Sequence, residues 1–365
     1  MSPETTIAWY VTPHGYGHLA RSCDILLAWL DLCPTARVVL SGTAFSSFVF
    51  SRLPQTRVTL RRAAFDVGLV QFDSIRADPA ASLHAALELT ERRSALVREE
   101  AAFLRSIGAR IVVADIPSLP LEAAAAVGLP SAAVGNFSWN WIYETMAQGD
   151  ERWNPVAAMY REGYARADLL LRLPFHEPMN AFRRRLDVPV VALPGRRRRE
   201  EIARAAGCDP AARWVLVGMG TVGWSDSALD RLEALRDVVF LTVRPLEWRR
   251  RNFRAFDPTS FPFADLVASA DVVLSKPGYG ILSECVVNDR PLVCVERDDF
   301  PEARVLVPAI RRYLRHAFVA QTDFYAGAIE SALKELREAP PPSARAPAGG
   351  APIAARALMR LANEA

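Results

Sequence analysis

Residues 270–302 read ADVVLSKPGYGILSECVVNDRPLVCVERDDFPE, and this stretch decides the fold class. An apolar, β-branched run at 271–274 ends in a glycine-rich turn, and a helical pattern begins near Ile281. A second apolar strand follows at 291–295. Two buried strands joined through a helix indicate a parallel βαβ unit whose sheet is covered on both faces by helices.

The same alternation extends along the rest of the chain. In the first half it predicts strands at 6–11, 36–41, 57–60, 111–114, 131–134 and 168–172, and helices at 19–31, 81–106 and 120–127. In the second half it predicts a connector and helix at 193–207 and strands at 213–218, 237–243, 271–274 and 291–295. The fold class that follows is α/β, with two Rossmann-like doubly wound units.

The length of the chain and its breaks in composition predict the domains. With 365 residues it is longer than one ordinary domain, so we expect an N-terminal domain at 1–190 and a C-terminal domain at 191–338. Residues 339–352 are rich in Pro, Ala and Gly and predict an extended linker. The amphipathic stretch that follows predicts a helix packed back on another part of the molecule, so 339–365 is expected to be linker and tail helix.

Composition argues against several classes of protein. The net charge of +3 gives no reason to expect nucleic-acid binding, and the five scattered cysteines form no CxxC pair for zinc or a disulfide framework. The N-terminus lacks the pattern of a signal peptide, and no apolar run has the length of a transmembrane segment. We therefore expect a cytoplasmic protein without a bound metal, and peripheral contact with a membrane remains open.

In open parallel sheets, ligands bind where the strands end at their carboxyl side. The first such end is VTPHGYGHLARS, residues 11–22. Gly15 and Gly17, with Tyr16 between them, let backbone amides approach a ligand or acceptor. His14 or His18 is a candidate general base, because imidazole titrates near neutral pH. The alternative is that one histidine only caps or packs.

A second strand end, VGMGTVGWSDS at 217–227, has glycines at the GxGxxG spacing. This loop, with Gly220, Thr221 and Gly223, predicts an amide cradle for a diphosphate. A dinucleotide site would need an acidic residue at the end of the next strand, but Arg244 stands there. A nicotinamide dehydrogenase is therefore the least favoured class, and we keep Arg244 as a donor-binding candidate.

The third strand end lies in the opening stretch. Its donor-binding candidates are Ser275, Lys276, Gly278, Tyr279, Gly280 and Glu284, followed after the next strand by Asp298 and Asp299. The glycines and the helix start form an anion cradle to which Lys276 adds a charge. Glu284 in the first helical turn is expected to accept hydrogen bonds from sugar hydroxyls, or else to complement the helix dipole. The two aspartates have a solvated surface loop as their alternative.

The fourth strand end is GNFSWNWIYE at 135–144. Its acceptor-binding candidates are Asn136, Phe137, Ser138 and Trp139. Rings beside amides suit a carbohydrate, and an aromatic plug in the core is the alternative. Asp115 ends the preceding strand and is a candidate either to orient a histidine or to act as the base itself.

These motifs resemble those of nucleotide-sugar glycosyltransferases of the GT-B fold, in which two Rossmann-like domains face a cleft. VTPHGYGHLARS, residues 114–144 and SKPGYGILSEC are similar to the glycosyltransferase-like N-terminal region of L-arabinokinases. More distantly, residues 275–302 resemble the diphosphosugar-binding segment of the peptidoglycan GlcNAc transferase family. That resemblance implies that Glu284 binds the nucleotide ribose and that His18 matches the family's histidine. Two positions depart from the pattern, Pro13 before the first histidine and Asn140 where an acidic residue is expected.

The resemblance implies transfer of a sugar from a nucleotide diphosphate sugar, a UDP-sugar by preference, to the hydroxyl group of an unknown acceptor. The donor is a co-substrate, and no further cofactor is expected. Inversion and independence of metal are favoured, since neither Glu284 nor Glu296 has the second glutamate, eight positions away, of retaining relatives. The alternatives are a non-catalytic UDP-sugar-binding or sensing protein and a UDP-sugar epimerase.

Overall fold

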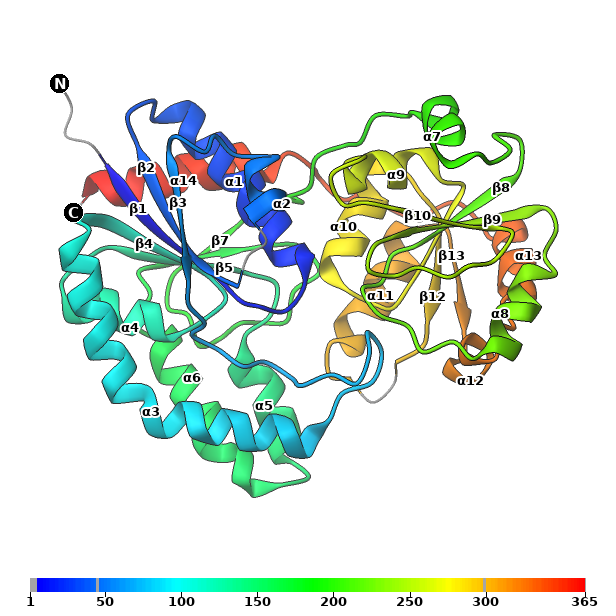
Figure 1. Cartoon of the computed structure of the whole chain (residues 1–365). Helices are drawn as coiled ribbons and strands as arrows, with labels where there is room; N and C mark the ends of the chain where they lie inside the picture. The colour runs from blue at the N-terminus through cyan, green and yellow to red at the C-terminus, as the bar shows by residue number, and fades with distance from the viewer. Residues whose placement is uncertain (1–4, 44–45, 298–299, 365) are drawn as a thin grey trace. The chain divides into compact units, whose positions relative to one another are not determined.

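The computed structural model describes residues 5–43, 46–297 and 300–364. The chain divides into two compact units, which are taken one at a time below (Figure 1). Unit 1 holds the residues up to Val70 together with Asp78–Ala192 and the stretch from Pro347 onward. Unit 2 holds Gln71–Ala77 and Leu193–Ala346.

Unit 1 is built on one parallel sheet. Its strands are β1 Thr6–Val11, β2 Arg37–Gly42, β3 Val58–Arg62, β4 Ala109–Asp115, β5 Ser131–Gly135, β6 Leu169–Arg172 and β7 Arg185–Asp187, in the order β3-β2-β1-β4-β5-β6-β7. The helical elements are α1 Tyr16–Leu32, α2 Ser46–Phe50, α3 Pro79–Ser106, α4 Leu119–Ala126, α5 Trp139–Ala147, η1 Glu151–Trp153, α6 Asn154–Tyr164 and α14 Gly350–Glu364. The strand order reverses between β1 and β4, the place where such sheets bind ligands.

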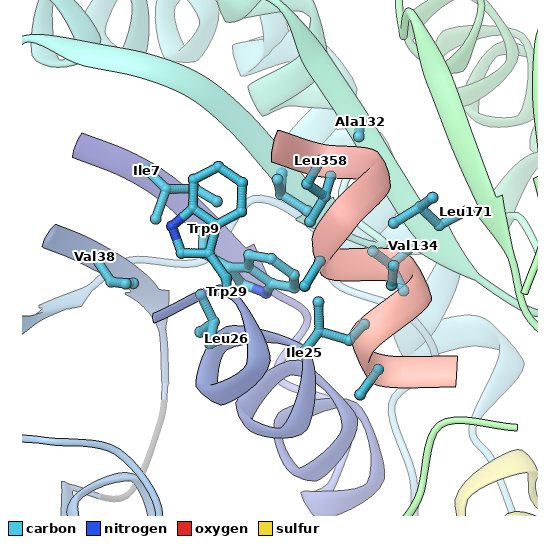
Figure 2. Close-up of a cluster of buried hydrophobic side chains, with 14 of the residues drawn as sticks. Ile7, Trp9, Ile25, Leu26, Trp29, Val38, Ala132, Val134, Leu171 and Leu358 are labelled. Carbon is cyan, nitrogen blue, oxygen red and sulfur yellow. The ribbon is translucent and has the colours of Figure 1, made fainter. Parts of the chain in front are cut away.

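The core of unit 1 explains why the last helix belongs to it. Trp9 of β1 and Trp29 of α1 are almost fully buried and share one apolar cluster with Leu358 of α14. Figure 2 shows α14 crossing the sheet beside α1, with Leu358 near Ala132. The alanines and leucines of α14 that face the sheet are buried. Their burial contributes about 25 cal/mol for each Å² of apolar surface removed from water.

Unit 2 repeats the same design. Its strands are β8 Arg213–Val217, β9 Val238–Val243, β10 Phe253–Phe256, β11 Val272–Ser275, β12 Leu292–Val295 and β13 His316–Val319, all parallel in the order β10-β9-β8-β11-β12-β13. Its helices are α7 Arg199–Ala206, α8 Asp226–Glu233, α9 Phe263–Ser269, α10 Tyr279–Asn288, α11 Ala303–Tyr313, α12 Gln321–Tyr325 and α13 Glu330–Glu338. The strand order reverses between β8 and β11, which carry the second and third of the predicted loops.

The boundaries of elements and units differ from the expectation in specific places. Helix α1 begins at Tyr16 instead of 19, so His18 lies in its first turn. Helix α10 begins at Tyr279, so Glu284 lies in the second turn and not the first. Sequence analysis predicted no helix within residues 135–144, but α5 begins there at Trp139. These helices include glycine or aromatic residues in their first turns. Such residues have low helix propensity, and tertiary packing overrides it.

The tail of the chain also differs from the expected linker. Residues up to Ala346 belong to unit 2, where the amide of Ala344 donates to the carbonyl of Arg312. Helix α14 begins at Gly350 within the expected linker, because Pro352 is tolerated in a first helical turn. Gly350 is required there, since a Cβ would lie 2.1 Å from the carbonyl oxygen of Pro189.

Candidate functional site

The strand reversal of unit 1 holds a network of charged side chains centred on Asp115. The end of β1 pairs with the end of β4, and the amide of Thr12 donates to the carbonyl of Asp115 at 2.8 Å. His18 Nδ1 lies 2.7 Å from Asp115 Oδ1. Arg21 Nε donates to Asp115 Oδ2 at 2.7 Å, and Ser22 Oγ donates to the same oxygen at 3.0 Å. Three residues of one helix face therefore converge on a carboxylate with no exposed surface.

The protonation states in this network follow from its charges. Burial raises the pKa of Asp115, but the Arg21 and His18 side chains outweigh it and bring the pKa to about 2. Burial, followed by the Arg21 charge, lowers the pKa of His18, while Asp115 opposes that shift. The lowered pKa leaves His18 a neutral imidazole near neutral pH. We assign its proton to Nδ1, because the Asp115 carboxylate oxygen beside Nδ1 can only accept. The basic lone pair of His18 is then on Nε2.

His14 has a different environment from His18. Its ring packs edge-on against Trp139, with centroids 5.3 Å apart. The ring also lies against Gly68, where a Cβ would approach His14 Nε2 to 1.9 Å. Gly68 has a φ of +54°, so both its backbone conformation and its contact require glycine. His18 also packs edge-on against an aromatic ring, Phe137, with centroids 6.0 Å apart, in addition to its contact with Asp115.

Asp66 is a buried acid that sequence reasoning did not identify. Its side chain is 3% exposed, and Oδ2 accepts a hydrogen bond from Trp139 Nε1 at 2.9 Å. Burial raises the pKa of Asp66 to about 7, while the hydrogen bond from Trp139 opposes the shift. The pKa shift arises because a desolvated carboxylate with few donors prefers its proton.

The predicted acceptor residues divide by burial. Asn136, Phe137, Ser138 and Trp139 are all at most 4% exposed. Asn136 accepts from Arg21 and donates to the carbonyl of Pro174, and Ser138 donates to Glu177. These residues form the interior plug that was the alternative interpretation.

By contrast, Gly15 and Tyr16 line a surface pocket at the ends of β1 and β2, and the Tyr16 residue is 41% exposed. Gly17 follows in the first turn of α1 and is partly buried. Gly15 has a φ of +84° and precedes the helix, a conformation that favours glycine.

A second pocket of unit 1 lies beside the buried plug. It is lined by Asn140, Trp141, Glu144, Arg161, Glu177, Pro178, Asn180 and Ala181. Within it the Asn140 amide donates to Glu144 at 2.9 Å. The expected acidic residue is thus replaced by an amide that is bonded to the carboxylate one helical turn later.

In unit 2, the glycine-rich loop after β8 holds a hydroxyl oxygen. The backbone amides of Gly220 and Thr221 donate to Ser74 Oγ at 3.2 Å and 3.0 Å. Two successive amides that point at one oxygen form the concavity that binds anions in other proteins. At Gly223, by contrast, the nearest neighbour of an added Cβ would be Asp73, 3.9 Å away.

Positive charge gathers beside the other loops of unit 2. Lys276 follows β11, and burial followed by the Arg297 charge lowers its pKa to about 8. The Glu302 and Asp73 carboxylates oppose that shift. Arg297 is 3% exposed and its guanidinium lies 3.8 Å from the centre of the Phe300 ring. Gly278 caps α10, whose positive dipole end adds to the same field.

The other donor-binding candidates are placed as follows. Ser275 is buried and donates to the carbonyl of Gly218 at 2.7 Å, which joins the ends of β8 and β11. Tyr279 is 6% exposed, Gly280 lies in the first turn of α10, and Glu284 is partly buried on that helix. Arg244 is engaged in ion pairs with Glu247 at 3.0 Å and Asp257 at 3.1 Å. Asp298 and Asp299 lie outside the described residues.

Two kinds of feature, a metal-binding cluster and a membrane-spanning helix, are absent from residues 5–43, 46–297 and 300–364. Among those residues, no cluster of three or more His, Cys, Asp or Glu side chains has the arrangement of a metal site. No helix within the same ranges combines the length and apolarity needed to cross a membrane.

Solved glycosyltransferase structures resemble the chain along nearly its whole length. A kitacinnamycin glycotransferase superposes with a TM-score of 0.59 at 14% identity, covering 99% of this chain and 96% of that chain. UGT89C1 of Arabidopsis thaliana, complexed with UDP-L-rhamnose, has a TM-score of 0.59 at 16% identity and covers 100% of this chain and 94% of that one. UGT2 of Phytolacca americana, complexed with UDP-2fluoro-glucose and pterostilbene, has a TM-score of 0.61 at 13% identity, with coverage of 99% and 94%. The chain has the GT-B fold.

This GT-B chain also has a relative in sequence. L-arabinokinase of Arabidopsis thaliana is 30% identical over 341 residues, which are 92% of this chain and 31% of that protein. The chain thus spans about a third of the length of that relative. No protein-family model matches the chain. The predicted resemblances to L-arabinokinases and to GT-B glycosyltransferases are confirmed, and the more distant one, to the GlcNAc transferase, stays a prediction.

Besides Asp66, sequence reasoning missed two features of the candidate site, and only one of them had a signal. Arg21 and Ser22 follow His18 by three and four positions, so they share its helix face once the helix is recognised. Ser74 had no signal, because it reaches the loop after β8 from a position 147 residues away along the chain. Such a contact depends on the path of the chain through space.

Proposed function

We propose that this chain is a glycosyltransferase that moves a sugar from a UDP-sugar to the hydroxyl group of an acceptor. In this proposal unit 2 binds the donor and unit 1 supplies the base. The observation that carries it is the bonded arrangement of His18, Asp115 and Arg21 at the strand reversal of a GT-B chain. The complexes of two fold relatives with UDP-sugars support the choice of donor.

The base chemistry follows from the hydrogen bonds of His18. Asp115 holds Nδ1–H, so Nε2 accepts the proton of the acceptor hydroxyl as the oxygen attacks the anomeric carbon. The imidazolium that forms is stabilised by the Asp115 carboxylate. Arg21 keeps that carboxylate ionised and fixed in place. Asp115 is therefore a positioning residue, and His18 is the proposed catalytic residue.

The leaving diphosphate requires charge stabilisation in unit 2. The amides of Gly220 and Thr221, the Lys276 ammonium and the start of α10 are proposed to supply it. Glu284 is proposed to bind the ribose. Because one base and one leaving-group site suffice for a single displacement, we propose inversion at the anomeric carbon. Since these protein groups supply positive charge, we also propose that transfer continues in the presence of EDTA.

The first test is a thermal-shift screen with UDP-, GDP-, ADP- and TDP-sugars. UDP-sugars should raise the melting temperature of the wild type, and Glu284→Ala should lose most of that shift. No stabilisation by any nucleotide sugar would contradict the proposal. So would an undiminished shift in the variant.

The second test measures release of UDP from the best donor, with water and a panel of alcohols as acceptors. His18→Ala should lower the rate by about 10²–10⁴-fold, the usual contribution of a positioned general base. His84→Ala is the matched control, because His84 is 79% exposed on α3. Donor binding without release of UDP would indicate the sensing alternative. A changed sugar still attached to UDP would indicate the epimerase.

A further inference from the structure

Residues 71–77 form a small hairpin, which we name hairpin 71–77, and it belongs to unit 2 although both neighbouring segments belong to unit 1. Gln71 and Ala77 pair as an antiparallel bridge, and the Phe72 amide donates to the Arg76 carbonyl at 3.0 Å. At its tip, Asp73 Oδ1 accepts from the amides of Ile75 and Arg76, both at 2.9 Å. The hairpin therefore holds its shape largely through its own hydrogen bonds.

The residues on either side of Ser74 contact the rest of unit 2. The Ile75 side chain is 1% exposed and belongs to the apolar cluster that includes Val217 and Met219. Tyr325 donates from its hydroxyl to Asp73 Oδ2 at 2.8 Å. These contacts lie on either side of Ser74 along the chain, so they fix where the Ser74 hydroxyl is directed.

Ser74 accepts hydrogen bonds from the same backbone amides that are proposed to bind the donor diphosphate. Its Oγ accepts from both Gly220 and Thr221, and its own amide donates to the Thr221 carbonyl at 3.3 Å. One N–H group cannot serve a serine hydroxyl and a phosphate oxygen at full strength together. The Asp73 carboxylate also acts electrostatically on Lys276, where it raises the ammonium pKa as a phosphate would.

We propose that hairpin 71–77 is a built-in gate of the donor site, with the Ser74 hydroxyl in the position of a diphosphate oxygen. This inference rests on the proposed function. The donor binds when the hairpin moves away from the loop after β8. Because this movement breaks the hydrogen bonds of Ser74, it lowers the apparent affinity for the donor. The hairpin keeps its internal bonds when it moves, so it moves as one piece.

The test compares the binding of UDP, and separately of inorganic pyrophosphate, by calorimetry on the full chain. Ser74→Ala should bind both about five- to tenfold more tightly, the change expected from one ordinary hydrogen bond removed from the competing state. Ser343→Ala is the matched control, since Ser343 is exposed and donates only to the Arg312 carbonyl. It should bind as the wild type does.

A second variant holds the gate shut. In Ser74→Cys/Thr221→Cys, the replaced hydroxyl oxygens lie 3.4 Å apart, so a disulfide should form with little movement. The oxidised protein should bind UDP at least tenfold more weakly than the same protein after reduction. The wild type, which contains the five native cysteines, controls for the effect of oxidation.

The outcomes separate the gate from the function on which it rests. Tighter binding by Ser74→Ala together with weaker binding by the oxidised pair supports the gate. Unchanged or weaker binding by Ser74→Ala overturns it while leaving the donor site intact, because Ser74 would then support the loop. Equal binding by the oxidised and reduced pair also overturns it. If neither the wild type nor Ser74→Ala binds UDP or pyrophosphate, the proposed donor site fails and the gate fails with it.

Discussion

Asp115 shows how one residue sets the properties of its neighbours. It accepts hydrogen bonds from His18, Arg21 and Ser22, and each bond fixes a side chain or a protonation state. From the sequence, the carboxyl at the end of β4 is a candidate either to orient a histidine or to act as the base itself. Which histidine it orients depended on the start of α1, which brings His18 onto the face that also carries Arg21.

The pH dependence of UDP release tests the state of His18. Because the pKa of His18 is lowered from 6.5, its base form persists below that pH. We expect the part of the kcat/KM profile that depends on His18 to stay level above about pH 6.5 and to fall only at lower pH. A separate fall near pH 8 should follow from loss of the Lys276 proton. The same profile in His84→Ala is the control. If kcat/KM falls with decreasing pH already above pH 6.5, and this fall depends on His18, then the pKa of His18 is not lowered.

Asp66 predicts an unusual stability effect. Its pKa is about 7 in the folded chain and near 3.8 when unfolded, so the folded state binds more protons between these values. Stability from this group is therefore fully present below pH 3.8 and is lost as pH rises through 7. Asp66→Asn keeps an acceptor for Trp139 and removes the buried charge. The change in the free energy of unfolding that this substitution causes should be about 2 kcal/mol more favourable at pH 8 than at pH 5.

Denaturant unfolding at the two pH values measures this difference. The exposed Asp31→Asn is a suitable control and should show almost no change between them. If Asp66→Asn is more destabilising at pH 8 than at pH 5, then the carboxylate is stabilised in the fold and the argument fails.

At the scale of the element, α14 shows that a helix can belong to a unit far from it in sequence. Leu358 is fully buried against the sheet of unit 1 (Figure 2). Leu358→Ala should lower the free energy of unfolding by about 2–5 kcal/mol, because it removes apolar contacts and leaves a cavity. Arg356→Ala, on the exposed side of the same helix, should cost less than about 0.5 kcal/mol. Equal effects of the two changes would show that α14 does not pack as described.

At the scale of the whole molecule, the chain enters unit 2 twice, at 71–77 and at 193–346, and returns to unit 1 each time. Ending the chain at Ala346 removes α14 from unit 1 although the cut follows unit 2. Hydrogen exchange measured by mass spectrometry should then be faster in β1 than in the intact chain, and nearly unchanged in β8. Faster exchange in β8 alone would contradict the assignment of α14 to unit 1.

The sequence by itself determined the two parallel α/β halves, the glycine-rich strand ends and the chemistry placed there, because periodicity and strand-end residues are local properties of the chain. It was also enough to single out the pair His14 and His18, together with Asp115 and Lys276. The tertiary structure alone decided that His18 bonds to Asp115, that Asp66 is buried, and that Ser74 meets the loop after β8. These facts depend on contacts between residues as many as 147 positions apart, which form only when the strands take their order in the sheets.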